Sequence, residues 1–565
     1  MEWSWPSRCY RLTCHLPGFE QCREVLCLLD GYPDLPGEPD YQPGPGASGQ
    51  HTVPQNFPHP LQQWPDSLQS AMTCFTAVLV APHEKILRAE RDTLGGRTAY
   101  WHHRNKSFGI STSSSLLASL FDTHGAENEN FMASMFAGHA EEPGQSAFSS
   151  IQEMLPGHAL EFRDGARRTV RIGSDFDGKG TSPNDPVGQF REAFGQAVAD
   201  ALPGRGEKAA IMLSGGMDSG PMAALAKEKD DSKSTRPLIV SWKLTEFPAA
   251  NEAHWIEAIA DFLGLDREIF EASSLLPFSA FDTQHVTPDF PAYNAFRPLV
   301  LESYRHASRN GANIVLNASG GDMTYPYFNW VLYDQLSRTD FLGALKTLSN
   351  LVSRNRSAFR FARLNLRYLA ARLLRGRRLP PRPPPAWLTR DAATEDSEFQ
   401  PLRVQFSGYR HPQYAQNLLT SAHGTAHENA FSNRYGLDRR DPFQNPRIVD
   451  LMLDLPFSFS HRKGYDKWIM REAMQSTLPD EIRLKGRTGL LNSFFNSGFS
   501  RNKNAISEFL LAGHRDWESW VRRDYIEAAL TGERTTPADQ LVIARCIGYV
   551  LWRMTLKETN ANGPR

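Results

Sequence analysis

The sequence has few of the features that mark specialised classes of protein. Six cysteines in 565 residues are too few for a disulfide-built secreted domain. The 62 Lys and Arg residues balance 63 Asp and Glu residues to a net charge of -1, which argues against a dedicated nucleic-acid binder. No apolar run approaches the roughly 20 residues of a membrane span. The first residues also lack the basic and apolar regions of a secretory signal, so we expect a cytoplasmic protein without a membrane span.

Four of the cysteines lie close together near the start of the sequence. Cys9, Cys14, Cys22 and Cys27 form two pairs with the spacing C-x4-C, which is similar to a zinc-ligand arrangement. The gap between the pairs is short, and its residues are typical of an apolar strand or helix. We therefore interpret the four residues as free thiols.

Length and residue pattern together predict two domains. A chain of 565 residues exceeds what one hydrophobic core supports. Residues 31–66 are rich in Pro, Gly and Asp, which predicts a long loop. Strand patterns then follow, including FTAVLVAP, ILRAER, TAYWHH and a hairpin at 160–172. We place the boundary at the linker that ends near residue 185, giving domains of 1–185 and 186–565.

After residue 185 the hydrophobic period changes from that of strands to that of helices. An amphipathic helix is predicted at 187–202, and short β-rich runs then alternate with helical segments as far as NIVLNASGGD. This alternation predicts an α/β fold with a doubly wound parallel sheet. Beyond residue 330 the pattern is mostly helical, which predicts a helical C-terminal part.

The strongest functional signal is the segment AAIMLSGGMDSG. A buried strand leads through Gly215 and Gly216 directly into a helix, whose N-terminal amides and dipole can bind an anion. Ser214 and Ser219 add hydroxyl donors, and Asp218 adds the hard oxygen that Mg²⁺ prefers. The spacing matches neither a Walker loop nor a dinucleotide-binding G-x-G-x-x-G. A Gly-rich turn without a ligand is the alternative interpretation.

This segment resembles the SGGxDS pyrophosphate loop of the ATP-pyrophosphatase superfamily. The resemblance implies ATP as cosubstrate. It also implies that backbone groups of Val240 and Ser241, near the end of the next strand, hold adenine. The loop residues expected to contact ATP are Leu213, Ser214, Gly215, Gly216, Asp218 and Ser219.

A second Gly-rich turn follows the last predicted strand and contains Asp322. The carboxyl ends of parallel strands meet at one edge of a sheet, so Asp218 and Asp322 are expected to converge there. Two such carboxylates would hold Mg²⁺ on a leaving pyrophosphate. Asp322 alone would more often be an ordinary turn residue, but its pairing with Asp218 favours the metal site.

Two later segments resemble the C-terminal half of asparagine synthetases: RDPFQNPRIVDLMLDLPFSF and GYDKWIMREAMQSTLPDEIRLKGRTG. Lys467 matches the family lysine that contacts phosphate and stabilises the adenylate-forming transition state. Arg471 is expected one helical turn further on the same face, as a second catalytic residue. Without the surrounding motif, an ordinary solvated lysine would be the better interpretation of Lys467.

The first domain resembles the glutamine amidotransferase domain of the same family, through the FTAVLVAP and RDTLGGR segments and through MLPGHALEF nearer its end. The resemblance implies an Ntn-hydrolase-like antiparallel sandwich. A working glutaminase of this family has Cys directly after the initiator Met, where this sequence has Glu2. We therefore expect a degenerate domain that does not release ammonia from glutamine.

Two further departures bear on the reaction. Ser319 stands where asparagine synthetases have Glu and β-lactam synthetases have Tyr, and Asn445 stands where the family has Asp. The resemblance that fits best is to a lasso-peptide macrolactam cyclase, which adenylates an Asp or Glu side chain of a precursor peptide and needs no ammonia. It implies an AMP-forming carbon–nitrogen ligase that uses ATP and Mg²⁺, with a leader peptidase and a leader-binding protein as candidate partners. The alternatives are an ammonia-dependent asparagine synthetase, a β-lactam-synthetase-like ligase and a catalytically silent scaffold.

A basic segment at 354–387 differs from the rest of the chain and ends in a Pro-rich stretch. We interpret its apolar stripe as a helix face packed on the domain, with solvated arginines. Docking of an acidic partner and a membrane-surface helix are the alternatives. The segment is also similar to an insertion of lasso-peptide cyclases. The stripe consists of Ala362, Leu366, Leu369, Ala370 and Leu373.

Overall fold

The computed structural model describes two N-terminal strands and most of the chain from residue 72 onward. The predictions for Glu2, for Cys22 and for the apolar stripe of the basic segment fall outside this part. The described residues are 9–14, 23–33, 72–81, 86–104, 107–123, 126–138, 144–163, 166–173, 184–203, 207–229, 236–283, 287–324, 335, 340–354, 385–389, 424–486, 491–532 and 535–562.

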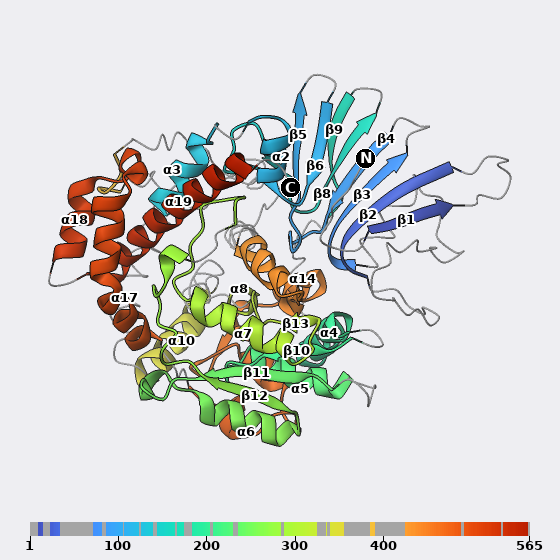
Figure 1. Cartoon of the computed structure of the whole chain (residues 1–565). Helices are drawn as coiled ribbons and strands as arrows, with labels where there is room; N and C mark the ends of the chain where they lie inside the picture. The colour runs from blue at the N-terminus through green and yellow to red at the C-terminus, as the bar shows by residue number, and fades with distance from the viewer. Residues whose placement is uncertain are drawn as a thin grey trace.

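The first half forms two antiparallel sheets (Figure 1). Six strands lie in the order β1-β2-β3-β4-β8-β9, and three lie in the order β6-β5-β7. Strand β2 pairs with β3 through Pro33, so it continues into the region predicted as a loop. The bounds are β1 Cys9–Cys14, β2 Arg23–Pro33, β3 Met72–Ala81, β4 Ile86–Arg91, β5 Tyr100–Arg104, β6 Ser107–Ser111, β7 Gln152–Glu153, β8 His158–Arg163 and β9 Ala166–Arg171.

The two antiparallel sheets pack face to face around a common core. Val78, Ala89 and Leu160 of the larger sheet share a buried cluster with Trp101 of the smaller one. The Phe162 ring of β8 meets the Trp101 ring edge-on, with 6.5 Å between the ring centroids. Side chains alternate between the two faces of a strand, so the period-2 pattern supplies one apolar face to this contact. The antiparallel sandwich expected for the first half is therefore present.

The second half is built around a parallel sheet of five strands in the order β12-β11-β10-β13-β14. The sequence pattern predicts the first four strands along the chain but misses β14. That strand has only three residues, all charged, and it pairs with β13 alone among the described strands. The bounds are β10 Ala209–Met212, β11 Leu238–Lys243, β12 Arg267–Glu271, β13 Ile314–Leu316 and β14 Asp438–Arg440.

Helices cover both faces of the parallel sheet, as the sequence predicts. Ile211 and Ile239 pack in one cluster with helices α4, α5 and α6, whereas Val240 and Val315 pack in another with α7. Strands buried on both faces need apolar residues at every position, which explains their continuous hydrophobic runs. The helix bounds are α4 Pro186–Ala201, α5 Ser219–Lys229, α6 Ala253–Leu263 and α7 Arg297–Arg309.

Strand β10 is the point at which the chain reverses its direction of progress across the sheet. Strands β11 and β12 follow on one side of it, and β13 and β14 lie on the other. In doubly wound sheets, ligands bind in the crevice beyond the carboxyl ends of the strands at such a reversal. The two glycine-rich turns follow β10 and β13, the strands that flank this point.

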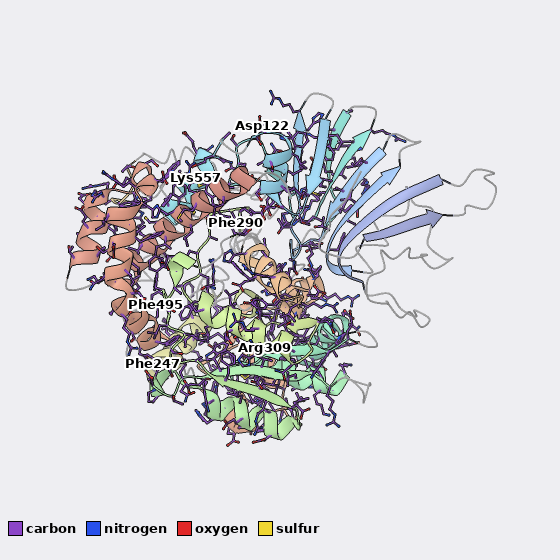
Figure 2. The ribbon with its side chains drawn as sticks, in the orientation of Figure 1. Asp122, Phe247, Phe290, Arg309, Phe495 and Lys557 are labelled. Carbon is purple, nitrogen blue, oxygen red and sulfur yellow. The ribbon has the colours of Figure 1, made fainter. Side chains whose placement is uncertain are left out.

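The C-terminal helices join the two halves through a shared hydrophobic core. In Figure 1, α19 runs from the α17 and α18 region toward α2 and α3 of the first half. Trp552 of α19 and Phe148 of the first half belong to one buried cluster, together with Phe290, which Figure 2 labels. The remaining bounds are α2 Ser114–Leu120, α3 Glu129–Ala137, α8 Gly321–Thr324, α10 Phe341–Arg354, α14 Pro446–Asp454, α15 Trp468–Ala473, α16 Asp480–Arg483, α17 Asn492–Ser507, α18 Arg523–Thr531 and α19 Pro537–Asn562.

A buried turn of the first half also reaches the edge of the parallel sheet. Asp92 holds this turn by accepting hydrogen bonds from the backbone amides of Gly96 and Arg97. The Arg97 guanidinium pairs with Asp438, the first residue of β14. Burial by itself would raise the pKa of Asp438, but Arg97 and Arg440 outweigh burial and hold the pKa at about 2. The first half therefore contacts β14 directly through this ion pair.

The predicted domain boundary and the predicted basic segment lie only partly among the described residues. The division into 1–185 and 186–565 stays a prediction. Residues 385–389, which end the basic segment, pack against the first half, where Trp387 Nε1 donates to the Phe136 carbonyl at 3.0 Å. No helix among the described residues is both long and apolar enough to cross a membrane.

Replacing Arg97 with alanine should destabilise the fold. The change leaves Asp438 without its partner from the first half, so we expect a loss of roughly 2–4 kcal/mol in the free energy of unfolding. Urea denaturation followed by circular dichroism measures this loss. Arg168→Ala, on the exposed part of β9, is the matched control. Equal urea midpoints for the two variants would show that the Arg97 link contributes nothing.

Candidate active site

The glycine-rich turn after β10 is held by hydrogen bonds to its own far end and to β11. The Leu213 amide donates to the Val240 carbonyl at 3.2 Å, and the Ser241 hydroxyl donates to the Leu213 carbonyl at 2.6 Å. The Ser214 amide donates to the Ser219 hydroxyl oxygen at 3.0 Å. These contacts close the turn between the strand and helix α5.

The same contacts change the interpretation of Val240 and Ser241. Both residues are fully buried, and the Val240 carbonyl is engaged inside the sheet rather than free for an adenine ring. On this strand the lining of the neighbouring cavity begins at Trp242. Val240 and Ser241 therefore support the turn from behind, and a direct contact with a nucleotide stays a prediction.

Residues in the middle of the turn line the neighbouring cavity. Gly215 has a φ of 71°, where a side chain is strained, and a Cβ there would meet Trp255 at 3.1 Å. The amides of Gly216, Met217 and Asp218 donate to no acceptor among the described residues. They lie at the N-terminus of α5, where the helix dipole is positive. This arrangement suits a phosphate group.

Lys467 reaches this turn from a distant segment of the chain. It follows the short strand β16 (Tyr465–Asp466) and directly precedes α15, with a φ of 53°. That left-handed conformation costs a residue other than glycine roughly 1 kcal/mol or more. Lys467 itself lies just before the helix begins. Arg471 follows one helical turn later, because its amide donates to the Lys467 carbonyl at 3.1 Å, and both residues line the same cavity.

Lys467 bridges the two carboxylates that the sequence predicts to converge. Its Nζ pairs with Asp218 and lies 2.7 Å from Oδ1 of Asp322. Burial by itself would lower the pKa of Lys467, but the two carboxylates outweigh burial and raise it, so the ammonium stays charged. The convergence of Asp218 and Asp322 is thus confirmed, whereas their role as metal ligands stays a prediction.

The two carboxylates fit a divalent cation bound together with phosphate. Oδ1 of Asp218 is buried and accepts no hydrogen bond from the described residues, and the Asp322 side chain is 66% exposed. Carboxylate and phosphate oxygens are the ligands that Mg²⁺ prefers. The described residues contain no group of three or more His, Cys, Asp or Glu side chains that could hold a metal by themselves. A cation here would therefore depend on oxygens from a phosphate ligand.

These groups line a cavity of about 440 Å³. That volume is within the range of pockets that bind small molecules. The wall combines the turn after β10, the end of β11, the start of α6 and the segments around residues 467 and 485. The lining residues are Ser214, Gly216, Met217, Asp218, Trp242, Leu244, Ala250, Asn251, Glu252, Ile256, Asp322, Asp466, Lys467, Arg471, Lys485, Gly486 and Leu491.

Arg471 organises one wall of this cavity. Its Nε donates to the Asp466 carbonyl at 2.7 Å, and its Nη2 donates to the Asp466 carboxylate at 2.9 Å. Its Nη1 donates to the carbonyl oxygens of Arg483 and Lys485 at 2.6 and 3.0 Å. Because the protein engages most of its donors, Arg471 is better suited to positioning this wall than to binding a substrate. Its predicted catalytic role stays a prediction.

The sequence patterns did not identify a second charged pair in the cavity. Lys485 lies on the lining, and its Nζ is 2.9 Å from Oε2 of Glu252, the residue before α6. Lys485 ends the LPDEIRLK segment, and Glu252 begins a predicted helix. Both residues therefore lie in segments that the sequence pattern identifies. Nothing local indicates that they meet, because 233 residues separate them in the sequence.

Asn445 and Ser319, which depart from the family pattern, both form hydrogen bonds within the protein. Asn445 precedes α14, and its side chain accepts the Arg447 amide at 2.9 Å, which caps that helix. The Ser319 amide hydrogen-bonds the carboxylate of Asp441. Burial raises the pKa of Asp441 to about 6, against the effect of Arg439. The cavity lining includes neither Ser319 nor Asn445.

Gly321 allows the two glycine-rich turns to approach each other. A Cβ at Gly321 would lie 2.5 Å from Oδ1 of Asp218, so Gly321→Ala should displace that carboxylate. We expect roughly tenfold or greater weakening of Mg·ATP binding, measured by calorimetry. Gly424→Ala is the matched control, because a Cβ at Gly424 meets nothing within 4 Å. Unchanged affinity in the Gly321 variant would contradict the assigned role of Asp218.

Most of the second half of the chain matches a known protein family. The asparagine synthase family model matches residues 189–551. Among solved structures, the glutamine phosphoribosylpyrophosphate amidotransferase from B. subtilis complexed with ADP and GMP aligns at 11% identity and a TM-score of 0.19, over 44% of this chain and 70% of its own. The U34-tRNA thiolase NcsA from Methanococcus maripaludis with its 4Fe-4S cluster aligns at 14% identity and a TM-score of 0.20, over 42% of this chain and 80% of its own. Scores this low carry no argument.

One curated relative matches along most of both chains. The glutamine-hydrolyzing asparagine synthetase 3 of Bacillus subtilis (strain 168) is 21% identical over 443 residues, which cover 75% of this chain and 68% of that protein. The family model itself spans more than half of this chain, including the turn after β10, Asp322 and Lys467. The chain belongs to the asparagine synthase family.

Proposed function

We propose that this chain is an ATP-dependent ligase that activates a carboxylate as an acyl-adenylate and then forms an amide bond. The observation that carries the proposal is the bridge from Lys467 to Asp218 and Asp322 beside the free amides of the turn after β10. It sits at the strand reversal where doubly wound sheets bind ligands. The site combines one cation, two carboxylates and several amide donors. This combination suits a nucleotide polyphosphate and the metal ion that it carries.

In the first step, a carboxylate oxygen of the substrate attacks the α-phosphorus of ATP. An oxygen–phosphorus bond forms to give the acyl-adenylate, and the bond to the bridging oxygen breaks to release pyrophosphate. Lys467 and the amides of the turn would stabilise the negative charge that moves onto the leaving group. Mg²⁺, held by Asp218 and Asp322, would supply further neutralisation of that charge.

In the second step, an amine attacks the acyl carbon. The new carbon–nitrogen bond displaces AMP, and the amine loses a proton. The cavity would favour this reaction over hydrolysis by holding the activated acyl group near the amine.

We propose a precursor peptide as the substrate, as in lasso-peptide biosynthesis. Its Asp or Glu side chain would form an amide bond with the peptide's own N-terminal amine and so close a macrolactam ring. Ser319 supports it, because neither the Glu of asparagine synthetases nor the Tyr of β-lactam synthetases is present there. A leader peptidase and a leader-binding protein are the proposed partners, and the cytoplasm is the proposed location. The family match favours an ammonia-dependent asparagine synthetase as the second candidate.

We also propose that residues 1–185 form a degenerate amidotransferase-like domain, Ntn-hydrolase-like in fold. The packed antiparallel sheets and the buried Arg91–Arg97 turn support this proposal. A glutaminase assay tests it by measuring ammonia released from glutamine with and without ATP. Release at the rate of a working amidotransferase would contradict it.

ATP–pyrophosphate exchange with Mg²⁺ tests the function and the substrate together. We expect exchange in the presence of a precursor peptide with an Asp or Glu in its core, and none with free aspartate. Exchange with aspartate alone would make the chain an ammonia-dependent asparagine synthetase. A protein that exchanges with neither and does not bind Mg·ATP would be the catalytically silent scaffold.

Asp218→Ala should lower the exchange rate by roughly a thousandfold or more, because it removes a metal ligand and one partner of Lys467. Thermal unfolding should show that the variant remains folded. Asp261→Ala, which changes an exposed carboxylate on α6, is the matched control. Near-normal exchange by the Asp218 variant would remove the basis of the proposed site.

A further inference from the structure

Lys485 is a second cation on the cavity wall. Its side chain is only 7% exposed, and the residue lines the same cavity as Lys467. The ammonium lies 2.9 Å from Oε2 of Glu252 and 4.8 Å from the centroid of the Trp255 ring. The carboxylate and the ring face thus hold the ammonium from two sides.

The wall behind Lys485 is fixed. Its carbonyl oxygen accepts a hydrogen bond from Nη1 of Arg471 at 3.0 Å, and the same nitrogen holds the Arg483 carbonyl. The long side chain therefore projects from an anchored backbone, and a small rotation of it changes the partner of Nζ without moving the wall.

Glu252 lies directly against the turn after β10. A Cβ at Gly215 would be 3.2 Å from Oε2 of Glu252. The other carboxylate oxygen, Oε1, is buried and has no hydrogen-bond partner among the described residues. A partly satisfied carboxylate beside a phosphate-binding turn repels a bound polyphosphate unless a cation lies between them.

Two lysines line the cavity. Lys467 is shared by Asp218 and Asp322, and Lys485 is held by Glu252. Pyrophosphate carries several negative charges on two phosphorus groups, and a single ammonium already shared by two carboxylates neutralises little of that charge. Lys467 and Lys485 can therefore both contribute a cation to the same anion.

We propose that Lys485 is a second pyrophosphate-binding cation, and that Glu252 competes with pyrophosphate for it. The inference rests on the proposed function and deepens it. When the anion is bound, Lys485 donates to a phosphate oxygen. When pyrophosphate leaves, Lys485 returns to Glu252. Because the Glu252 carboxylate competes for the ammonium, it lowers the affinity for pyrophosphate and favours release of this product.

The competition predicts opposite effects for the two partners. Lys485→Met removes a charge-assisted hydrogen bond to the anion, so the affinity for pyrophosphate should fall roughly ten- to a hundredfold. Glu252→Gln removes the competing charge and releases Lys485, so the affinity should rise by several-fold. If Glu252 served only to hold the structure together, its loss would weaken binding instead.

The experiment is isothermal titration of the full chain with inorganic pyrophosphate and Mg²⁺. Lys463→Met is the matched control, because Lys463 also lies 4.8 Å from a tryptophan ring, that of Trp468, but is outside the cavity lining. Thermal unfolding of each variant checks that it is folded, and Lys485→Arg should restore part of the affinity. The expected result is weaker binding for Lys485→Met, tighter binding for Glu252→Gln and no change for the control.

Two results would overturn the inference. Wild-type affinity in the Lys485 variant would show that this lysine does not contact pyrophosphate. Weaker binding in the Glu252 variant would show that there is no competition. The proposed function is judged separately by ATP–pyrophosphate exchange in the unmodified chain, so an enzyme that exchanges normally while Lys485→Met binds pyrophosphate normally refutes only the role of Lys485.

Discussion

The site depends on one ion-pair bridge, from Lys467 to Asp218 and Asp322. The bridge ties together the ends of two neighbouring strands and a segment that lies 249 residues after Asp218. Without the lysine, two carboxylates would face each other in a partly buried cavity, which is electrostatically unfavourable. The two carboxylates in turn help to hold Lys467 in its left-handed conformation before α15. Each group therefore makes the position of the others possible.

The architecture explains why this bridge forms where it does. The reversal of strand order at β10 brings the turns after β10 and β13 side by side. The β13 edge carries β14, and the first half of the chain contacts β14 through the Arg97–Asp438 pair. The antiparallel sandwich thus contributes to the sheet that carries the site, whatever chemistry it has itself. Support of the half that carries the candidate site is a sufficient physical reason for the two halves to share a core.

Several residues that resemble functional ones prove to hold the site in shape. Ser241 and Ser219 use their hydroxyl groups to close the turn, and Asn445 caps α14. Arg471 uses its guanidinium to bind backbone carbonyls behind the cavity. Hydroxyl, amide and guanidinium groups that are satisfied by the protein's own turns and helix ends have little left for a ligand, so these contacts support a positioning role for these residues.

The sequence alone determined the parts of this protein that depend on neighbouring residues. A strand, a glycine turn and a helix in succession identify the anion-binding turn, and the repeated alternation of strands and helices predicts the parallel sheet that brings Asp218 and Asp322 together. The motif around Lys467 was recognisable, although its local conformation was not. Tertiary structure alone decided that β14 completes the sheet, that Arg471 faces backbone carbonyls, and that Lys485 meets Glu252 across 233 residues. These contacts join distant segments, and short-range propensity and periodicity carry no information about which distant segments will meet.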